Sequence, residues 1–140
     1  MKAVTFSYDD GVTQDIRLVE ILNRYNLKAT FNLNSELLGK DGSLDILGKR
    51  ILHNKIQPHE ITEVYKGHEI AAHTLTHPDM TEMPADEVIR QVEQDRLNLS
   101  ELSGTEVIGM AYPGRQPNYN SRIARIIKNG TGVKYARTTI

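Results

Sequence analysis

The sequence predicts a single α/β domain in which helices connect the strands of a parallel sheet or of an incomplete barrel. Short runs rich in β-forming residues alternate with segments whose apolar residues have helical spacing, and polar residues follow several of the runs directly. We expect about five strands. With 140 residues, of which 39% are hydrophobic and 25% charged, the chain has the length and composition of one domain, residues 1–140, with its own core.

The first strand, helix and second strand occupy the segment up to residue 34. Residues 3–8 are rich in β-formers and end on Asp-Asp-Gly, which is typical of a turn. Residues 13–25 carry apolar side chains on helical spacing, and residues 28–34 read as the next strand. A right-handed crossover would make these two strands parallel neighbours.

The pattern changes between residues 37 and 56. Two short β-like runs, at 43–47 and 50–56, are separated by Gly48 and Lys49, so we expect a surface hairpin. In the second half the alternation resumes, and it predicts helices at 58–66, 84–103 and 121–128 and strands at 68–72, 107–112 and 133–138.

Four polar side chains stand directly after two of the predicted strands. Asp9 and Asp10 follow the first strand, and His73 and His77 follow the strand at 68–72. Because the carboxyl ends of parallel strands meet at one edge, we expect the four to converge. Two imidazoles and one carboxylate leave open positions on a metal, as in catalytic zinc sites, and the second carboxylate is then available as a base. His53 and His59, in the hairpin and at a helix start, fit surface or capping roles better.

The composition limits the partners and the ligand types. A formal net charge of -1 without a run of like charges predicts neither a nucleic-acid surface nor a membrane-seeking face, so we expect a small or neutral partner. Cysteine is absent, so thiolates and disulfides play no part. The start of the chain enters a strand pattern at once without a signal-peptide region, which predicts a cytoplasmic or a trimmed protein.

Two segments resemble the signatures of the polysaccharide deacetylases, also called carbohydrate esterase family 4. Residues 7–11, Ser-Tyr-Asp-Asp-Gly, look like the family's Thr-Phe-Asp-Asp-Gly. Residues 67–77, Gly-His-Glu-Ile-Ala-Ala-His-Thr-Leu-Thr-His, look like its Gly-His-Glu-Ile-x-x-His-(Ser/Thr)-x-x-His. Residues 28–31 resemble the strand between them, and the resemblance covers essentially the whole chain.

The resemblance implies a fold, a reaction and a role for each residue. It implies a distorted β/α barrel that removes acetyl groups from N- or O-acetylated carbohydrates, such as chitin, peptidoglycan or xylan. By position, Asp9 would be the general base, and Asp10, His73 and His77 the ligands of a divalent metal, most simply Zn²⁺. Family members are often extracellular or at the cell surface. The reaction class would be a hydrolase acting on non-peptide carbon-nitrogen bonds.

Two departures from the family pattern bear on activity. The family's Arg-x-Pro-Tyr signature falls on residues 111–114, Ala-Tyr-Pro-Gly, so the arginine that orients the base is missing, and we look to Arg115 as its replacement. In this region, backbone N–H groups near Tyr112 and Gly114 are candidates for holding an oxyanion, and the ring of Tyr112 for stacking on a sugar. The later signatures, including a histidine that resembles a general acid, have no counterpart, which predicts a truncated or minimal member.

Two other functions remain open at this point. The first is a metal-containing homologue that binds an acetylated carbohydrate with little or no turnover. The second is a non-haem iron oxygenase, whose metal is also held by two histidines and a carboxylate, although a second carboxylate beside the ligand favours hydrolysis. Finally, an incomplete barrel leaves strand edges and an apolar inner face uncovered, so we expect a homo-oligomer.

Overall fold

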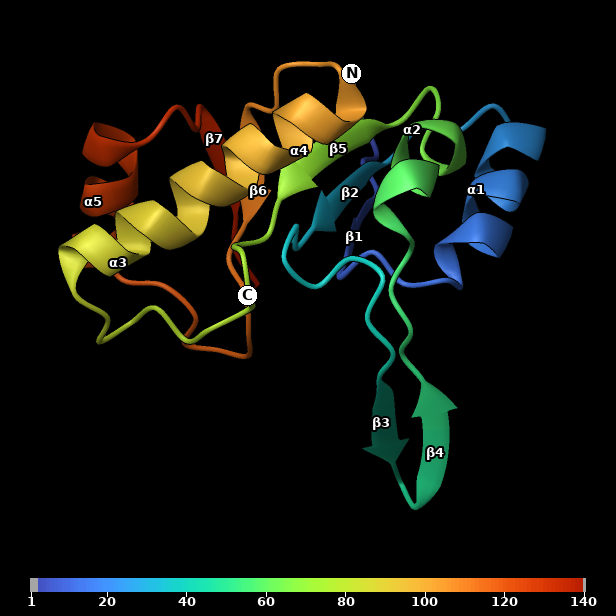
Figure 1. Cartoon of the computed structure of the whole chain (residues 1–140), viewed down its shortest axis with the longest axis horizontal. Coiled ribbons are helices and arrows are strands. Elements are labelled where there is room, and N and C mark those ends of the chain that lie inside the picture. Colours follow the sequence, from blue (N-terminus) through green and yellow to red (C-terminus); the bar gives the residue numbers. More distant parts are fainter. Residues whose placement is uncertain (1–2, 140) are drawn as a thin grey trace.

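A computed structural model describes residues 3–139, and its centre is a five-stranded parallel sheet (Figure 1). The spatial order is β1-β2-β5-β6-β7, with every neighbouring pair parallel. The strands are β1 (Ser7–Asp9), β2 (Thr30–Leu33), β5 (Glu69–Ala72), β6 (Gly109–Ala111) and β7 (Tyr135–Arg137). The predicted number and direction of strands are confirmed, although each strand is shorter than its sequence pattern suggested.

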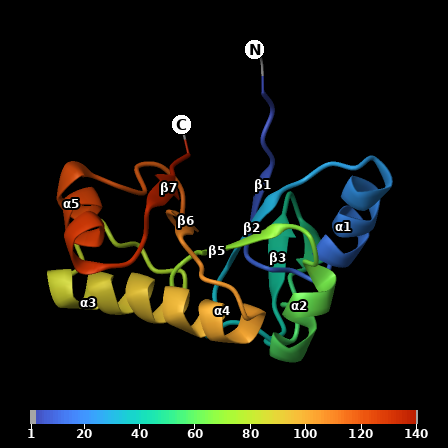
Figure 2. The same ribbon diagram turned by 90° about the horizontal axis from the view of Figure 1, so that it is seen from above.

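Helices connect these strands and cover one side of the sheet. In chain order they are α1 (Asp15–Arg24), the 3₁₀ turn η1 (Pro58–Glu60), α2 (Ile61–Val64), α3 (Ala85–Ile89), the π turn η2 (Arg90–Gln94), α4 (Asp95–Ser103) and α5 (Ser121–Gly130). Figure 2 shows α3 and α4 in line along one side of the sheet, with the segment that leads into β1 on the other side. The helix predicted at 84–103 is therefore present, but a π turn interrupts it.

The hydrophobic core lies between the sheet and these helices. Phe31 and Met110 point from the sheet, and Val88, Val92 and Leu99 meet them from the long helix; all five are fully buried. Side chains alternate between the two faces of a strand, so the residues before and after Phe31 and Met110 point to the opposite face of the sheet.

The other face of the sheet is polar and strongly curved. Arg137 on β7 donates hydrogen bonds to Ser7 and Asp9 on β1, although β7 and β1 are the two edges of the sheet. In a flat sheet, four intervals of about 4.8 Å would separate them by about 19 Å, far more than an arginine side chain spans. The sheet therefore curls into a half-barrel whose edges are joined by side chains.

This polar face corrects one premise of the predicted homo-oligomer. We expected an apolar inner face that a second copy would bury, but the inner face carries Ser7, Thr30, Asn32, Glu69 and Arg137, joined to one another and to their neighbours by hydrogen bonds. Among the described residues, the outer edges of β1 and β7 have no strand partner, so the homo-oligomer stays a prediction.

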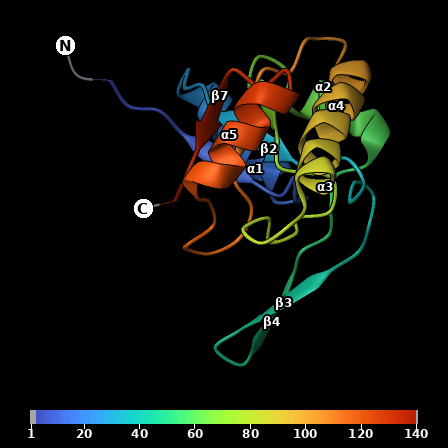
Figure 3. The same cartoon turned by 90° about the vertical axis from the view of Figure 1, so that its left-hand side faces the viewer.

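The predicted hairpin is confirmed as β3 (Ser43–Ile46) and β4 (Lys49–Leu52), paired antiparallel. It projects from the body of the molecule as an arm (Figures 1 and 3). The chain returning from β4 forms an isolated antiparallel bridge between Lys55 and Val12, just after β1. This bridge brings the base of the arm to the carboxyl end of β1. No helix within residues 3–139 is long and apolar enough to cross a membrane.

One carboxyl group of α1 is buried in the core. Asp15 is 4% exposed and accepts a hydrogen bond from the hydroxyl of Tyr65 at 2.8 Å. Burial raises the pKa of Asp15 from 3.8 to about 6, and the bond from Tyr65 only partly opposes this rise. The folded state therefore holds a proton on Asp15 that the unfolded chain releases at a lower pH.

The sign of this effect gives a prediction for stability. Asp15 stabilises the fold fully below about pH 4, and this contribution is lost as the pH rises through about 6. We expect the free energy of unfolding of the wild type, relative to that of Asp15→Asn, to fall by about 2 to 3 kcal/mol between pH 4 and pH 7.5. Urea unfolding at a series of pH values measures this difference. The control Asp41→Asn, at an exposed position, should show no such trend.

Candidate metal centre

Asp10, His73 and His77 come together at the carboxyl edge of the sheet. Each offers one ligand atom, and the three atoms lie within 4.8 Å of one another. Asp10 directly follows β1, and His73 directly follows β5. The parallel sheet thus places the two sequence segments side by side, as their positions after strands predicted.

The backbone at this edge adopts conformations that side chains usually avoid. Asp10, Thr74 and His77 have φ angles of +81°, +69° and +60°. A β-branched residue such as Thr74 is rarely found there, and each such residue costs about 1 to 3 kcal/mol. Gly11 also has a φ of +60°, and a Cβ at this position would lie 2.9 Å from Cδ2 of Leu33. The backbone conformation of the turn after Asp10 therefore favours glycine, and a larger residue would also displace the end of the Leu33 side chain.

His73 is held in one orientation and kept neutral. Its Nδ1 lies 2.9 Å from the carbonyl oxygen of Ala111, which can only accept, so Nδ1 carries the proton and Nε2 is left as the ligand atom. Burial lowers the pKa of His73. A neutral imidazole with a free Nε2 is the form that binds a metal.

Asp10 is surrounded by nitrogen atoms of basic side chains. Its carboxylate oxygens lie 3.5 Å from Nζ of Lys55, 3.4 Å from Nε2 of His53 and 3.7 Å from Nε2 of His77. Partial burial by itself would raise the pKa of Asp10, but Lys55 and the histidines outweigh this effect and lower it. Asp10 is therefore an anion, as a metal ligand must be.

Two of these neighbours were not predicted to be at the site. Lys55 was not singled out, and His53 was expected on the surface or at a helix cap, whereas it lies beside Asp10. Both stand on the chain that returns from the hairpin, and the bridge between Val12 and Lys55 brings them to the site. No motif marks them, because that pairing depends on the path of the hairpin.

Asp9 is oriented by two donors and stands next to the cluster. Nδ2 of Asn32 lies 2.9 Å from Oδ1 of Asp9, and the guanidinium of Arg137 donates to the same oxygen. Ser7 and the carbonyl oxygen of Tyr8 hold the amide of Asn32 in turn. Because both donors bind Oδ1, the carboxylate presents Oδ2 for accepting a proton.

The loop after β6 differs from our expectations in two respects. The arginine that binds Asp9 is Arg137, because the curl of the sheet brings β7 toward β1. Arg115 lies exposed in the loop after β6. The backbone N–H of Tyr112 donates to the carbonyl oxygen of Arg137 at 3.0 Å, so it is not free for an oxyanion.

The ring of Tyr112 is likewise unavailable as a platform for a sugar. It is 5% exposed and packs against Tyr119, with ring centroids 5.4 Å apart. Tyr119 is 45% exposed and is the accessible ring of the pair. Gly114 is exposed, with a φ of +86°, and its role toward an oxyanion stays a prediction.

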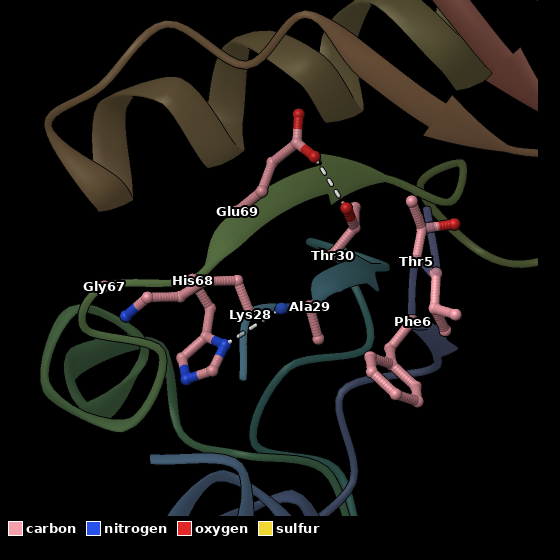
Figure 4. Close-up of a pocket in the computed structure, with 9 residues that line it drawn as sticks. Thr5, Phe6, Lys28, Ala29, Thr30, Gly67, His68 and Glu69 are labelled. Atoms are coloured by element: carbon pink, nitrogen blue, oxygen red, sulfur yellow. Dashed lines mark hydrogen bonds between the residues drawn. The ribbon is translucent and has the colours of Figure 1, made fainter. Parts of the chain in front are cut away.

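The first residues of the second signature lie at the opposite end of β5. A shallow hollow at the amino ends of β1, β2 and β5 is lined by Thr30, His68 and Glu69, among others (Figure 4). The N–H of Ala29 donates to Nδ1 of His68, and the hydroxyls of Thr30 and Tyr135 donate to Glu69. These residues connect β5 with its neighbour β2 and, across β6, with β7, and they belong to the end of the sheet opposite the metal cluster.

The donor set fits a divalent ion. The three residues supply two imidazole nitrogens and one carboxylate, one histidine is locked in the ligating tautomer, and Asp9 adds a carboxylate outside the cluster. Nitrogen and oxygen donors of this kind suit zinc and neighbouring transition metals.

Comparison with known proteins identifies the family of this chain. The family model described as polysaccharide deacetylase matches residues 1–136, and the chain therefore belongs to the polysaccharide deacetylase family. A bifunctional xylanase/deacetylase of Pseudobutyrivibrio xylanivorans is 27% identical over 107 residues, which are 76% of this chain and 15% of that protein.

Solved structures of two related proteins show the same fold. The deacetylase PplD of Streptococcus pyogenes, in complex with acetate, superposes with a TM-score of 0.71 at 19% identity, covering 99% of this chain and 65% of that one. BA3943, a pseudoenzyme of carbohydrate esterase family 4 from Bacillus anthracis, gives 0.64 at 18% identity, covering 94% of this chain and 42% of that one. The chain thus spans less than two thirds of the length of each of these three proteins.

The cluster predicts which substitutions remove the metal. Replacing His73 or His77 by Ala should abolish stoichiometric Zn²⁺, because each removes one of three protein ligands. Elemental analysis after dialysis at neutral pH measures the metal content, and His59→Ala, at an exposed helix start, is the control. Undiminished metal in both ligand variants would exclude this site.

Proposed function

We propose that the protein is a metal-dependent hydrolase that removes acetyl groups from N- or O-acetylated carbohydrate. The observation that carries the proposal is the pairing of a three-ligand cluster with a separate, oriented carboxylate. Asp10, His73 and His77 would hold the ion, and Asp9 lies next to them with its own donors. Membership of the polysaccharide deacetylase family supports the reaction class and the carbohydrate substrate.

A divalent ion in this cluster would supply Lewis-acid chemistry, by acidifying water and polarising the acetyl carbonyl. Asp9 then takes the proton of the attacking water on Oδ2, while Arg137 and Asn32 hold Oδ1 in place. Water adds to the carbonyl carbon, the bond from that carbon to the sugar nitrogen or oxygen breaks, and acetate forms. The leaving amine or hydroxyl takes up a proton, and Asp9 is a local source of one.

The donor set favours Zn²⁺ as the ion. Two imidazoles with one carboxylate make a three-ligand site with an open position, the arrangement of catalytic zinc. The same three ligands also suit iron oxygenases, but Asp9 beside the cluster provides the base that hydrolysis needs.

A second candidate is a metal-containing homologue that binds acetylated carbohydrate without useful turnover. The likeness to the structure of a pseudoenzyme favours it. Against it stands Arg137, which supplies Asp9 with the arginine that the Ala-Tyr-Pro-Gly stretch lacks.

The role of Asp9 predicts a separation of metal binding from turnover. Asp9→Asn should keep stoichiometric Zn²⁺, because it removes no ligand, and should lower acetate release by about 10²- to 10⁴-fold, because it removes the base. Acetate release from N-acetylglucosamine oligomers and acetylated xylan oligomers at saturating Zn²⁺ measures the rate. Asp45→Asn, on the exposed hairpin, is the control.

Equal rates for the wild type and Asp9→Asn would exclude Asp9 as the base. If the wild type holds Zn²⁺ and binds these oligomers but releases no acetate from any of them, the binding homologue is the better description.

The role of Arg137 is tested by its own pair of variants. Arg137→Gln should lower kcat by about 10- to 100-fold with little change in KM, because Asp9 loses its donor but the substrate contacts remain. Arg137→Lys should recover part of the rate, because it keeps a cation near Asp9, and Arg115→Gln should behave as the wild type. A larger loss for Arg115→Gln than for Arg137→Gln would reverse this assignment.

A further inference from the structure

The long helix contains one π turn, η2, and this turn faces the loop that holds the two histidines. A π turn shifts the helical hydrogen bonds by one residue and is found often at functional sites. Here the carbonyl oxygen of Gln91 accepts a hydrogen bond from the backbone N–H of Leu75 at 3.0 Å. The loop from His73 to His77 thereby gains a hydrogen-bond acceptor. In a regular α-helix, this carbonyl oxygen would accept from a backbone N–H of the helix itself.

The side chain of Gln91 binds the next residue of the same loop. It is 3% exposed, and its Oε1 accepts from the backbone N–H of Thr76 at 3.2 Å. Its Nε2 also donates to the hydroxyl of Thr76 at 3.1 Å. One residue of the π turn therefore binds two successive residues between the histidines.

Asp95, one turn further along the helix, binds the start of the loop. It is 0% exposed, and its Oδ2 accepts from the backbone N–H of His73 at 2.9 Å. Its Oδ1 accepts from the N–H of Ser35 at 2.7 Å, in the loop after β2. A buried carboxylate is costly unless its bonds are used, and both oxygens of Asp95 are used to fix two loops against the helix.

These bonds hold a loop whose own conformation is unfavourable. Thr74 and His77 both have positive φ angles. The helix binds the N–H groups of Leu75 and Thr76 and shares that of His73 with the carbonyl oxygen of Leu33. The side chain of Asn34 adds bonds to the carbonyl oxygens of His73 and Thr74, so the helix and β2 together hold a loop with two strained residues. The bonds from the helix are the part of this support that reaches the middle of the loop, between the two histidines, and that part orients the second imidazole relative to the first.

We propose that Gln91 and Asp95 are positioning residues of the metal centre, which hold the loop from His73 to His77 in the conformation that aims both imidazoles at Asp10. The inference rests on the proposed metal site and deepens it. The π turn is then part of this site, because it supplies the third acceptor, the carbonyl oxygen of Gln91. Neither side chain touches the ion, the substrate or the reacting atoms.

The test is the Zn²⁺ affinity of folded variants, measured by competition with a chromophoric chelator at neutral pH. Gln91→Met keeps the volume of the side chain and removes its hydrogen bonds to Thr76. Asp95→Asn replaces one carboxylate oxygen by an NH₂ group, which cannot accept a hydrogen bond, so the N–H of either His73 or Ser35 loses its bond to this side chain. Each should raise the Kd for Zn²⁺ by about 10- to 100-fold, as expected when the groups that orient ligands are lost. The visible spectrum of the Co²⁺-loaded protein should change in both, because the ligand geometry changes.

Two controls on the same helix separate positioning from general destabilisation. Val92→Ala removes buried volume next to Gln91 but no hydrogen bond to the loop, so it should lower the urea midpoint and leave the Kd within about twofold. The amide of Gln94 bonds only to Asn98, so Gln94→Met should change neither the urea midpoint nor the Kd. If Gln91→Met does not fold, Gln91→Asn replaces it, since its amide is too short to reach Thr76.

The outcomes distinguish the positioning role from the metal site itself. If wild-type protein binds Zn²⁺ and His77→Ala does not, but folded Gln91→Met and Asp95→Asn bind as tightly as the wild type, the positioning role is refuted and the metal site stands. The positioning role is also refuted if Val92→Ala weakens binding as much as they do. A wild type that binds no Zn²⁺ would instead refute the proposed site, and the inference with it.

Discussion

The curl of the sheet, which brings Arg137 of β7 to Ser7 and Asp9 of β1, is the constraint on which the geometry of the candidate site depends. This contact joins the first and last strands of the sheet through the interior, and so it requires the sheet to curl. The same guanidinium fixes one oxygen of Asp9. A loss of curvature would therefore also be a loss of orientation at the carboxylate, and the fold and the chemistry cannot be separated at this point.

The negative charges of the site are balanced by basic side chains of the protein itself. Asp10 lies among Lys55, His53 and His77, and Asp9 is paired with Arg137. Two adjacent carboxylates would otherwise repel each other at short range. A cation entering the cluster would compete with Lys55 for Asp10, so the lysine that stabilises the carboxylate also opposes metal binding.

The parts of the fold and site that the sequence predicts are those with a local cause. Strands, helices and the placement of Asp10, His73 and His77 follow from periodicity and from the order of strands in a parallel sheet. The parts that the sequence does not predict depend on contacts between residues far apart in the chain. Arg137 reaches Asp9 only because the sheet curls, and Lys55 reaches Asp10 only because the hairpin returns past Val12. The π turn has no marker in the residue pattern, since its apolar stripe still reads as one helix.

The second signature spans the whole length of β5, from Gly67 to the loop at His77, and its two ends do different work. Gly67 has a φ of +81° before the strand, and His68 and Glu69 connect strands at the amino edge, whereas the histidines at the other end lie close to Asp10. A homologue that kept the first half and lost the two histidines would keep the contacts of the amino edge and lose two of the three candidate ligands. The first half of the signature thus carries the architecture of the sheet, and the second half carries the chemistry proposed for this edge.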